Sequence, residues 1–397
     1  MAYIYAKVNK NTLRFIRDKE QVSFDYIKRV TKFSEEKVRS WEDEESNKFP
    51  TINQAKTLAK CYHVPFAGFY MNSEDINIKY LPKIVNKRTM QDSIEDDSAV
   101  NLAIIDLLND RDSFIDMKEE LREKIPTFDL SISSNNDNVV DWAHTIRSYF
   151  DIDLSEQYYT SSKRKFYLYL RQKVESKGIF IQGFVKVPPE VMRGVAIADG
   201  TLPIIGVNDE DRHPAKSFTI IHELVHIIKR TSAICNDMMD SSTTDREEVF
   251  CNAVAGEALV PYEALFSFIN SNDISEYNLS DVDKLASAFS VSSEVIARRL
   301  LDTKKCNYSS YLYISDELRK KYEDTKRKRK EAKLAGRPIS IPRNMPREAI
   351  DRTSAYYCDV LLRGLSEGII DKADLSSYIG IGEKHINKFI SEVMRWY

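Results

Sequence analysis

The amino-acid sequence predicts a mainly helical protein built around a small α+β core. Apolar residues recur at helical spacing in short bursts over residues 1–70 and again over the last 50 residues. Three strand-like runs near the middle of the chain precede a long apolar helix, which is typical of an α+β module. With 397 residues, the chain is long enough for two or three folding units.

The composition excludes several classes of protein. The chain has 58 Lys and Arg against 61 Asp and Glu, so its net charge of −3 argues against a histone-like protein, and any contact with nucleic acid must be local. With 42% hydrophobic residues, 12 Gly and 12 Pro, it is neither collagen-like nor wholly disordered. No apolar run reaches about 18 residues, and charge interrupts the N-terminal sequence too early for a signal peptide. We therefore expect a cytoplasmic location and no contact with a membrane.

The cysteines are scattered and never form a Cys-x-x-Cys pair. This pattern indicates free thiols rather than disulfides or a cysteine-based zinc site. The five are Cys61, Cys235, Cys251, Cys306 and Cys358.

Residues 1–71 are expected to form a compact unit of five short helices. The apolar bursts begin after Ser23, Ser34 and Thr51, each of which stands where a helix N-cap is expected. Helices this short do not persist alone, so they must pack together. The first 70 residues carry 13 basic and 9 acidic residues, a local charge of +4.

Three further segments follow along the chain. Residues 72–97 show no sustained period and are expected to be a linker. Residues 98–305 contain helical patterns on both sides of the strand-like runs, and residues 306–397 are expected to be a helical C-terminal region. The strand-like runs are residues 178–182, 194–197 and 202–207.

The C-terminal region contains a basic segment at residues 318–337. It holds 10 basic and 3 acidic residues, a local charge of +7. Two interpretations remain open, a strip that contacts phosphate or a partner, and a solvated helix or loop.

The strongest chemical signal is the run His222-Glu223-Leu224-Val225-His226, inside a helix that is apolar almost all round. Residues i and i+4 share one face of a helix, so His222 and His226 can present two imidazoles to one Zn²⁺. Glu223 can act as general base toward a water molecule that the metal activates. A helix that is apolar on all sides is buried, and buried His and Glu side chains need a compensating partner.

A third carboxylate is expected from a second helix over residues 245–261. Its apolar positions are spaced as in a helix, and a glutamate in its first turn would point into the same core. Glu248 lies 22 residues after His226, which leaves room for a loop and a return helix. Two histidines, one glutamate and one open position are typical of a catalytic rather than a structural zinc site.

These motifs resemble those of the ImmA/IrrE family of zinc-dependent metallopeptidases. The likeness rests on the pattern FTxxHELxH, on the Glu-x-x-x-Asn helix that ends in Ala-Leu-Val-Pro at residues 258–261, and on the strands upstream. It is strong over about residues 165–265, and the C-terminal stretch is similar to the tail of long, phage-type or mobile-element members.

The resemblance implies both a fold and a set of roles. Residues 98–305 would be a zincin-like metallopeptidase domain with a small β-sheet. Zn²⁺ would be held by His222, His226 and Glu248, with Glu247 as the alternative third ligand. Glu223 would be the catalytic base in peptide hydrolysis.

The N-terminal unit resembles a helix-turn-helix domain of the Xre/Cro type, through residues 32–42 and the Phe-Pro-Thr that follows. By this resemblance, one helix enters the major groove of DNA and a basic flank touches the DNA backbone. The residues assigned to that helix are Ser34, Lys37 and Arg39, and those of the flank are Lys28 and Arg29.

Two features depart from the DNA-binding pattern. Glu35 and Glu36 stand at the start of the reading helix, where acidic groups repel phosphate. Phe24 stands where many DNA-binding members carry Gln. Protein docking, to a related helix-turn-helix protein or to an adjacent domain, is therefore the competing use of this unit.

The sequence thus predicts a cytoplasmic zinc-dependent metalloendopeptidase fused to a helix-turn-helix domain, which regulates transcription by cleaving a specific protein. By resemblance, the substrate class is a helix-turn-helix repressor, and a toxin encoded nearby is the other partner expected. The alternative is a non-proteolytic DNA-binding regulator or antitoxin-like protein that retains the zinc fold. Glu223 favours the enzyme, because a scaffold would not need it.

Overall fold

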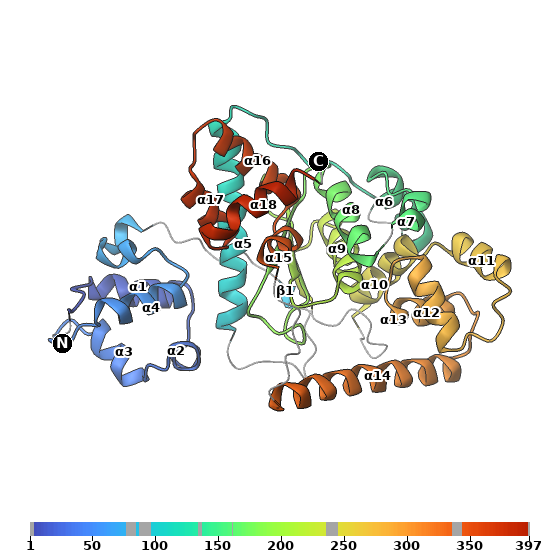
Figure 1. Ribbon diagram of the computed structural model, residues 1–397, viewed down its shortest axis with the longest axis horizontal. Coiled ribbons are helices and arrows are strands. Elements are labelled where there is room, and N and C mark those ends of the chain that lie inside the picture. The colour runs from blue at the N-terminus through green and yellow to red at the C-terminus, as the bar shows by residue number, and fades with distance from the viewer. Residues whose placement is uncertain are drawn as a thin grey trace.

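The computed structural model describes residues 4–76, 85–86, 97–133, 137–160, 162–235, 245–335 and 344–395. The predicted fold class is confirmed, because the chain is mostly helical around one small mixed sheet (Figure 1).

The N-terminal unit consists of short helices around one apolar core. Ser23 and Thr51 cap helices as predicted, accepting bonds from the backbone N–H groups of Tyr26 and Gln54, whereas Ser34 makes no side-chain capping bond. The fifth helix is a 3₁₀ turn. The elements are α1 (Lys10–Lys19), α2 (Phe24–Thr31), α3 (Glu35–Glu42), α4 (Ile52–Cys61) and η1 (Phe66–Tyr70).

The N-terminal unit packs on the first half of α5 (Ser98–Glu120). The Ser98 hydroxyl accepts a hydrogen bond from Ser23 N at 2.8 Å, and His63 Nδ1 lies 2.7 Å from Asp106 Oδ2. Leu102 of α5 joins the apolar core of the unit. The segment expected to be a linker contributes a 3₁₀ turn, η2 (Ser73–Asp75), and one short strand, β1 (Val85–Asn86), and its other residues from 77 to 96 lie outside the described part.

The sheet joins β1 to β2 (Phe180–Phe184), β3 (Gly194–Ile197), β4 (Ile204–Asn208) and β5 (Ala233–Cys235). The strand order is β1-β5-β3-β4-β2. Strands β2 and β4 are parallel, β3 is antiparallel to β4 and β5, and β1 is parallel to β5. The three strand-like runs of the sequence correspond to β2, β3 and β4. Strand β2 begins and ends two residues later than its run, and β4 begins two residues later and ends one residue later than its run.

Helices cover both faces of this sheet. Alternate strand residues point to opposite faces, so Ile205 and Val207 join one core while Phe180 and Ile204 join the other. The first face carries α6 (Val139–Tyr149), α7 (Leu154–Tyr159), α8 (Lys163–Glu175), α9 (His213–Ile228), α10 (Arg246–Leu259), α11 (Tyr262–Ser271), α12 (Leu279–Ala288) and α13 (Ser293–Asp302). The second face carries α5 with α15 (Met345–Arg352), α16 (Ala355–Ser366), α17 (Lys372–Ile379), η4 (Glu383–His385) and α18 (Ile386–Val393).

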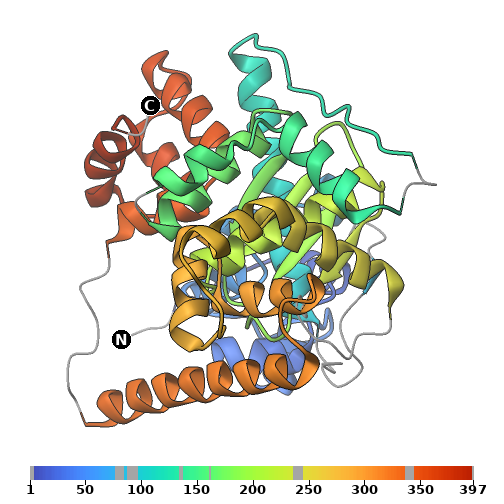
Figure 2. The same ribbon diagram turned by 90° about the vertical axis from the view of Figure 1, so that its right-hand side faces the viewer.

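A single long helix, α14 (Tyr308–Leu334), contains most of the predicted basic segment and runs along one edge of the molecule (Figure 2).

Among the described residues, no single helix has both the length and the apolar composition needed to cross a bilayer. The bent pair α10 and α11 meets these criteria jointly, and α10 is largely buried in the core described above.

Candidate metal centre

Helix α9 places two histidines in the interior of the protein. Every residue from Lys216 to Ile228 is buried, because α9 is enclosed by the sheet, α8 and α10. The side chains of His222 and His226 are 0% exposed, and their rings lie 5.2 Å apart between centroids, as expected for residues one turn apart.

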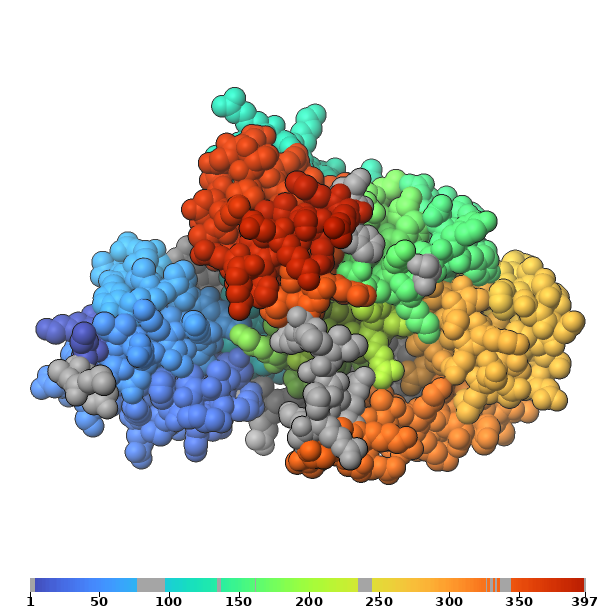
Figure 3. Space-filling view, in the orientation of Figure 1, coloured from blue at the N-terminus to red at the C-terminus, as the bar shows by residue number. Residues whose placement is uncertain are grey.

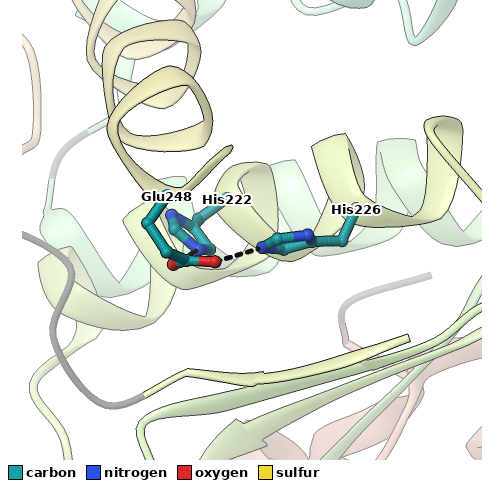
Figure 4. A group of neighbouring side chains, drawn as sticks. All are labelled: His222, His226 and Glu248. Atoms are coloured by element: carbon teal, nitrogen blue, oxygen red, sulfur yellow. Dashed lines mark ion pairs between the residues drawn. The ribbon is translucent and has the colours of Figure 1, made fainter. Parts of the chain in front are cut away.

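Helix α10 brings a carboxylate to the two imidazoles. Glu248 lies in the first turn of α10, after the N-cap Asp245, and is 3% exposed. Its Oε2 is 3.2 Å from His222 Nε2 and its Oε1 is 3.2 Å from His226 Nε2 (Figure 4). Within the part of the chain that the structure describes, these three side chains form the group of His, Cys, Asp or Glu that could hold one metal ion, with ligand atoms within 4.8 Å of one another.

The other nitrogen of each imidazole faces a hydrogen-bond acceptor. His222 Nδ1 lies 2.9 Å from Asn252 Oδ1, and His226 Nδ1 lies 3.2 Å from the Thr231 hydroxyl. A proton on Nδ1 leaves the lone pair of Nε2 free to bind a metal. Both histidines are thus held with Nε2 toward Glu248. The sequence pattern contained Asn252 as the last residue of the Glu-x-x-x-Asn helix but gave it no role, and it did not single out Thr231.

Glu223 lies beside the cluster of His222, His226 and Glu248, on the adjoining side of α9. It is 0% exposed and faces strand β3. A Cβ atom added to Gly194 of β3 would lie 2.3 Å from Glu223 Oε1 and 2.5 Å from Thr219 Cγ2. A side chain larger than hydrogen would therefore displace the Glu223 carboxylate, and this close approach explains glycine at position 194.

Electrostatic interactions within the group shift its pKa values. Burial opposes ionisation of Glu248, but the two imidazoles outweigh it and hold the pKa of this carboxyl well below its ordinary value. Burial and the charge of His222 lower the pKa of His226. Burial also opposes the charged form of His222, but hydrogen bonds and the charges of Glu248 and Glu223 raise its pKa. The pKa values of the two histidines are thus shifted in opposite directions, and a metal ion bound at both Nε2 atoms would require both imidazoles to be neutral.

The chemistry of these three side chains is that of a metal site rather than of a packed apolar core. Three polar side chains converge at a buried point, where a bound cation would compensate their combined desolvation. Imidazole nitrogens with one carboxylate oxygen are a donor set that zinc prefers. Glu247, the alternative third ligand, lies outside the group, because its Oε1 is 3.8 Å from His226 Nδ1 and also 3.8 Å from Lys229 Nζ.

Comparison with known families bears directly on this site. Residues 185–301 match the Peptidase_M78 family model, the IrrE N-terminal-like domain. This IrrE-like segment runs from the end of β2 through α13 and contains His222, Glu223, His226 and Glu248. No curated protein and no solved structure matches the chain. The match supports the predicted resemblance over this segment and does not extend to the N-terminal unit.

The predicted DNA-binding residues lie outside the IrrE-like segment, on α2, on α3 and at the N-cap of α3. All five are exposed and none approaches the metal group. Arg39 pairs with Glu35 at 2.7 Å and lies over the Phe24 ring at 4.3 Å. Glu35 and Phe24, which both depart from the DNA-binding pattern, thus contact the same arginine. Lys37 lies over the rings of Phe33 and Trp41. The five positions are Lys28, Arg29, Ser34, Lys37 and Arg39.

Proposed function

We propose that the protein is a zinc-dependent metalloendopeptidase. One observation carries this proposal, the convergence of His222, His226 and Glu248 at a buried point with Glu223 on the same helix, inside the IrrE-like segment. A scaffold could retain a metal through three ligands alone, whereas a second buried carboxylate next to the first histidine serves chemistry.

Each residue has a defined part in this proposal. Nε2 of His222, Nε2 of His226 and the carboxylate of Glu248 would hold zinc, and Asn252 and Thr231 would orient the two rings. Zinc at this position would supply Lewis acidity, which polarises a peptide carbonyl and activates water. Glu223 would take the proton from that water and later deliver it to the leaving amine.

The proposal also includes a role for the N-terminal unit and a class of substrate. The N-terminal unit would act as a helix-turn-helix domain of the Xre/Cro type, with Ser34, Lys37 and Arg39 toward the major groove and Lys28 and Arg29 toward the backbone. The substrate would be a specific cytoplasmic protein such as a helix-turn-helix repressor, so cleavage would change transcription. The exposure of all five side chains supports this use of the unit.

A second candidate is a non-proteolytic DNA-binding regulator, or an antitoxin-like binding protein with a toxin encoded nearby as its partner. The complete burial of the metal group favours it, because His222, Glu223 and His226 are each 0% exposed and offer no surface to a polypeptide. In that case the metal would stabilise the fold and Glu223 would have no role in chemistry.

Two variants separate these candidates. Metal analysis of the purified protein should find about one zinc per chain, and His222→Ala should remove it. Glu223→Gln should keep the zinc and lower cleavage of a co-expressed candidate repressor by about 10²-fold or more, since a general base contributes 10²–10⁴-fold. Glu263→Gln, on the exposed surface of α11, is the matched control and should cleave like the wild type.

The outcomes point in opposite directions. A wild-type protein that is free of zinc after purification from metal-replete cells would overturn the metal centre. A zinc-loaded protein whose regulatory phenotype is unchanged by Glu223→Gln would support the binding protein instead.

A further inference from the structure

Helix α14 divides into two parts of opposite character. Its first part, residues 308–324, has three basic and four acidic residues. Its second part, residues 325–334, has six basic residues and one acidic residue, a net charge of +5. We call this second part the basic half of α14.

The first part is anchored to the rest of the protein. Tyr311 and Ile314 are buried in the core that also contains α12 and α13, and α14 packs along α13. Its charges are locally neutralised, because Asp316 lies 2.7 Å from Arg319 and 2.8 Å from Lys320. Lys321 also reaches Asp283 of α12 at 3.1 Å.

The basic half projects beyond these contacts. Figures 1 and 2 agree that α14 runs along the lower edge of the molecule and that its later turns extend past α12 and α13. In Figure 3 the coloured atoms of α14 lie at the surface along that edge. Arg327 is 66% exposed, and among the side chains that the structure describes in this half, its ion pairs with Asp324 and Glu331 stay within α14.

The charge of the basic half exceeds what the helix itself can neutralise. Favourable interaction with the helix dipole is confined to roughly the last turn, whereas basic residues begin at position 326, more than two turns before the end. Like charges three and four residues apart on a helix repel one another. A bound polyanion would remove this repulsion.

The pattern of residues favours a nucleic-acid backbone over other polyanions. Positions 326–330 are all basic, and successive positions of a helix rotate by about 100°, so these five positions are distributed around the helix axis. The basic half has no apolar stripe, since Ala332 and Leu334 are its apolar residues, so it lacks the face that enters a lipid surface or a protein groove. Its ten residues span about 15 Å, long enough to cross several phosphates of a duplex.

We propose that the basic half of α14 binds the phosphate backbone of double-stranded DNA without reading its sequence. This contact is separate from the one proposed for α2 and α3, and it does not require that the N-terminal unit binds DNA. It gives the protein a sequence-independent affinity for duplex DNA that depends steeply on salt.

The test measures binding of the full-length protein to a fluorescent 30-base-pair duplex of arbitrary sequence, from about 50 to 200 mM NaCl. Each phosphate contact contributes about −0.9 to the slope of log affinity against log salt concentration. Arg327→Gln with Lys328→Gln should therefore reduce the slope by about 1.8. The matched control, Arg319→Gln with Lys320→Gln, removes the same charge from the first part of α14 and should change the slope little.

Arg39→Ala tests the N-terminal unit separately. If it abolishes preference for one promoter while the arbitrary duplex still binds, the two contacts are distinct.

Three results would overturn the proposal for α14: no binding of wild type at 50 mM NaCl, equal slopes for the two double variants, or tighter binding to polyglutamate than to duplex. The last result would identify an acidic protein as the partner. Circular dichroism should show that both double variants keep the wild-type helix content, because the substituted side chains are exposed.

Discussion

At the scale of single residues, the orientation of the His222 ring depends on Asn252. Its Oδ1 accepts from His222 Nδ1 at 2.9 Å, and it lies four residues after Glu248, on the same face of α10. Without this acceptor, the His222 proton can move to Nε2, the atom that faces Glu248, and Nε2 can then no longer bind metal.

Asn252→Ala is therefore expected to weaken zinc affinity by about 10–100-fold, the usual effect of losing a partner of a metal ligand. Competition with a chromogenic chelator measures it. Asn252→Asp keeps an acceptor oxygen and should bind zinc at least as tightly as the wild type, and Asn270→Ala, on the exposed side of α11, is the control. Unchanged zinc affinity in Asn252→Ala would show that the ring is held by other means.

At the scale of elements, the contact between the N-terminal unit and α5 contains a buried carboxyl. Glu20, at the C-cap of α1, is 3% exposed, and its Oε2 has no hydrogen-bond partner among the described residues. Burial, with the charge of Asp106 on α5, raises the pKa of Glu20 to about 8.

This raised pKa predicts a specific pH dependence of stability. Between about pH 4.5 and 8 the folded protein holds a proton on Glu20 that the unfolded chain releases, so stability falls as pH rises through this window. Glu20→Gln keeps the shape and removes the titration. Its free energy of unfolding should lie close to that of the wild type near pH 5 and exceed it at pH 8 by on the order of 4 kcal/mol, because each unit of pKa difference corresponds to about 1.4 kcal/mol. Glu119→Gln, an exposed change on α5, should follow the wild type at every pH, and a constant difference for Glu20→Gln would contradict the prediction.

Elements with a local signal could be predicted from the sequence, and those formed by distant pairing could not. Helix α9 and the first turn of α10 follow from apolar spacing and from the carboxylates near Asp245. Strand β5 has three residues, too few for alternation to show, and β1 pairs with it from 148 residues earlier in the chain. The roles of Asn252 and Gly194 depend on contacts between elements, so no residue near them in sequence reveals these roles.

At the scale of the whole molecule, the C-terminal helices hold the metal-bearing helix in place. Asp351 of α15 accepts two bonds from Arg164 Nε of α8, at 2.7 and 3.0 Å, and lies 3.2 Å from Nε2 of His213, the first residue of α9. Arg171 donates to the backbone carbonyls of Asp351 and Ile350, at 2.9 Å each. Residues more than 130 positions apart thus connect α15 to both α8 and α9.

Asp351→Ala removes the carboxylate that joins these three helices and leaves Arg164 in a largely buried place without its partner. Breaking such a pair costs about 3–5 kcal/mol, so the thermal midpoint at pH 7 should fall sharply. Burial opposes ionisation of Asp351, but bonds from His213 and Arg164 outweigh it and hold its pKa below the ordinary value. The stabilisation is therefore present above the pKa of this carboxyl in the unfolded chain, about 3.8, and is lost as pH falls below it. The difference in stability between the variant and the wild type should therefore become smaller in acid.

Asp359→Ala is the control. It removes a half-exposed partner of Arg363 in α16 and should cost less than about 1 kcal/mol. Equal losses in the two variants would mean that Asp351 does not hold α15 against α8 and α9.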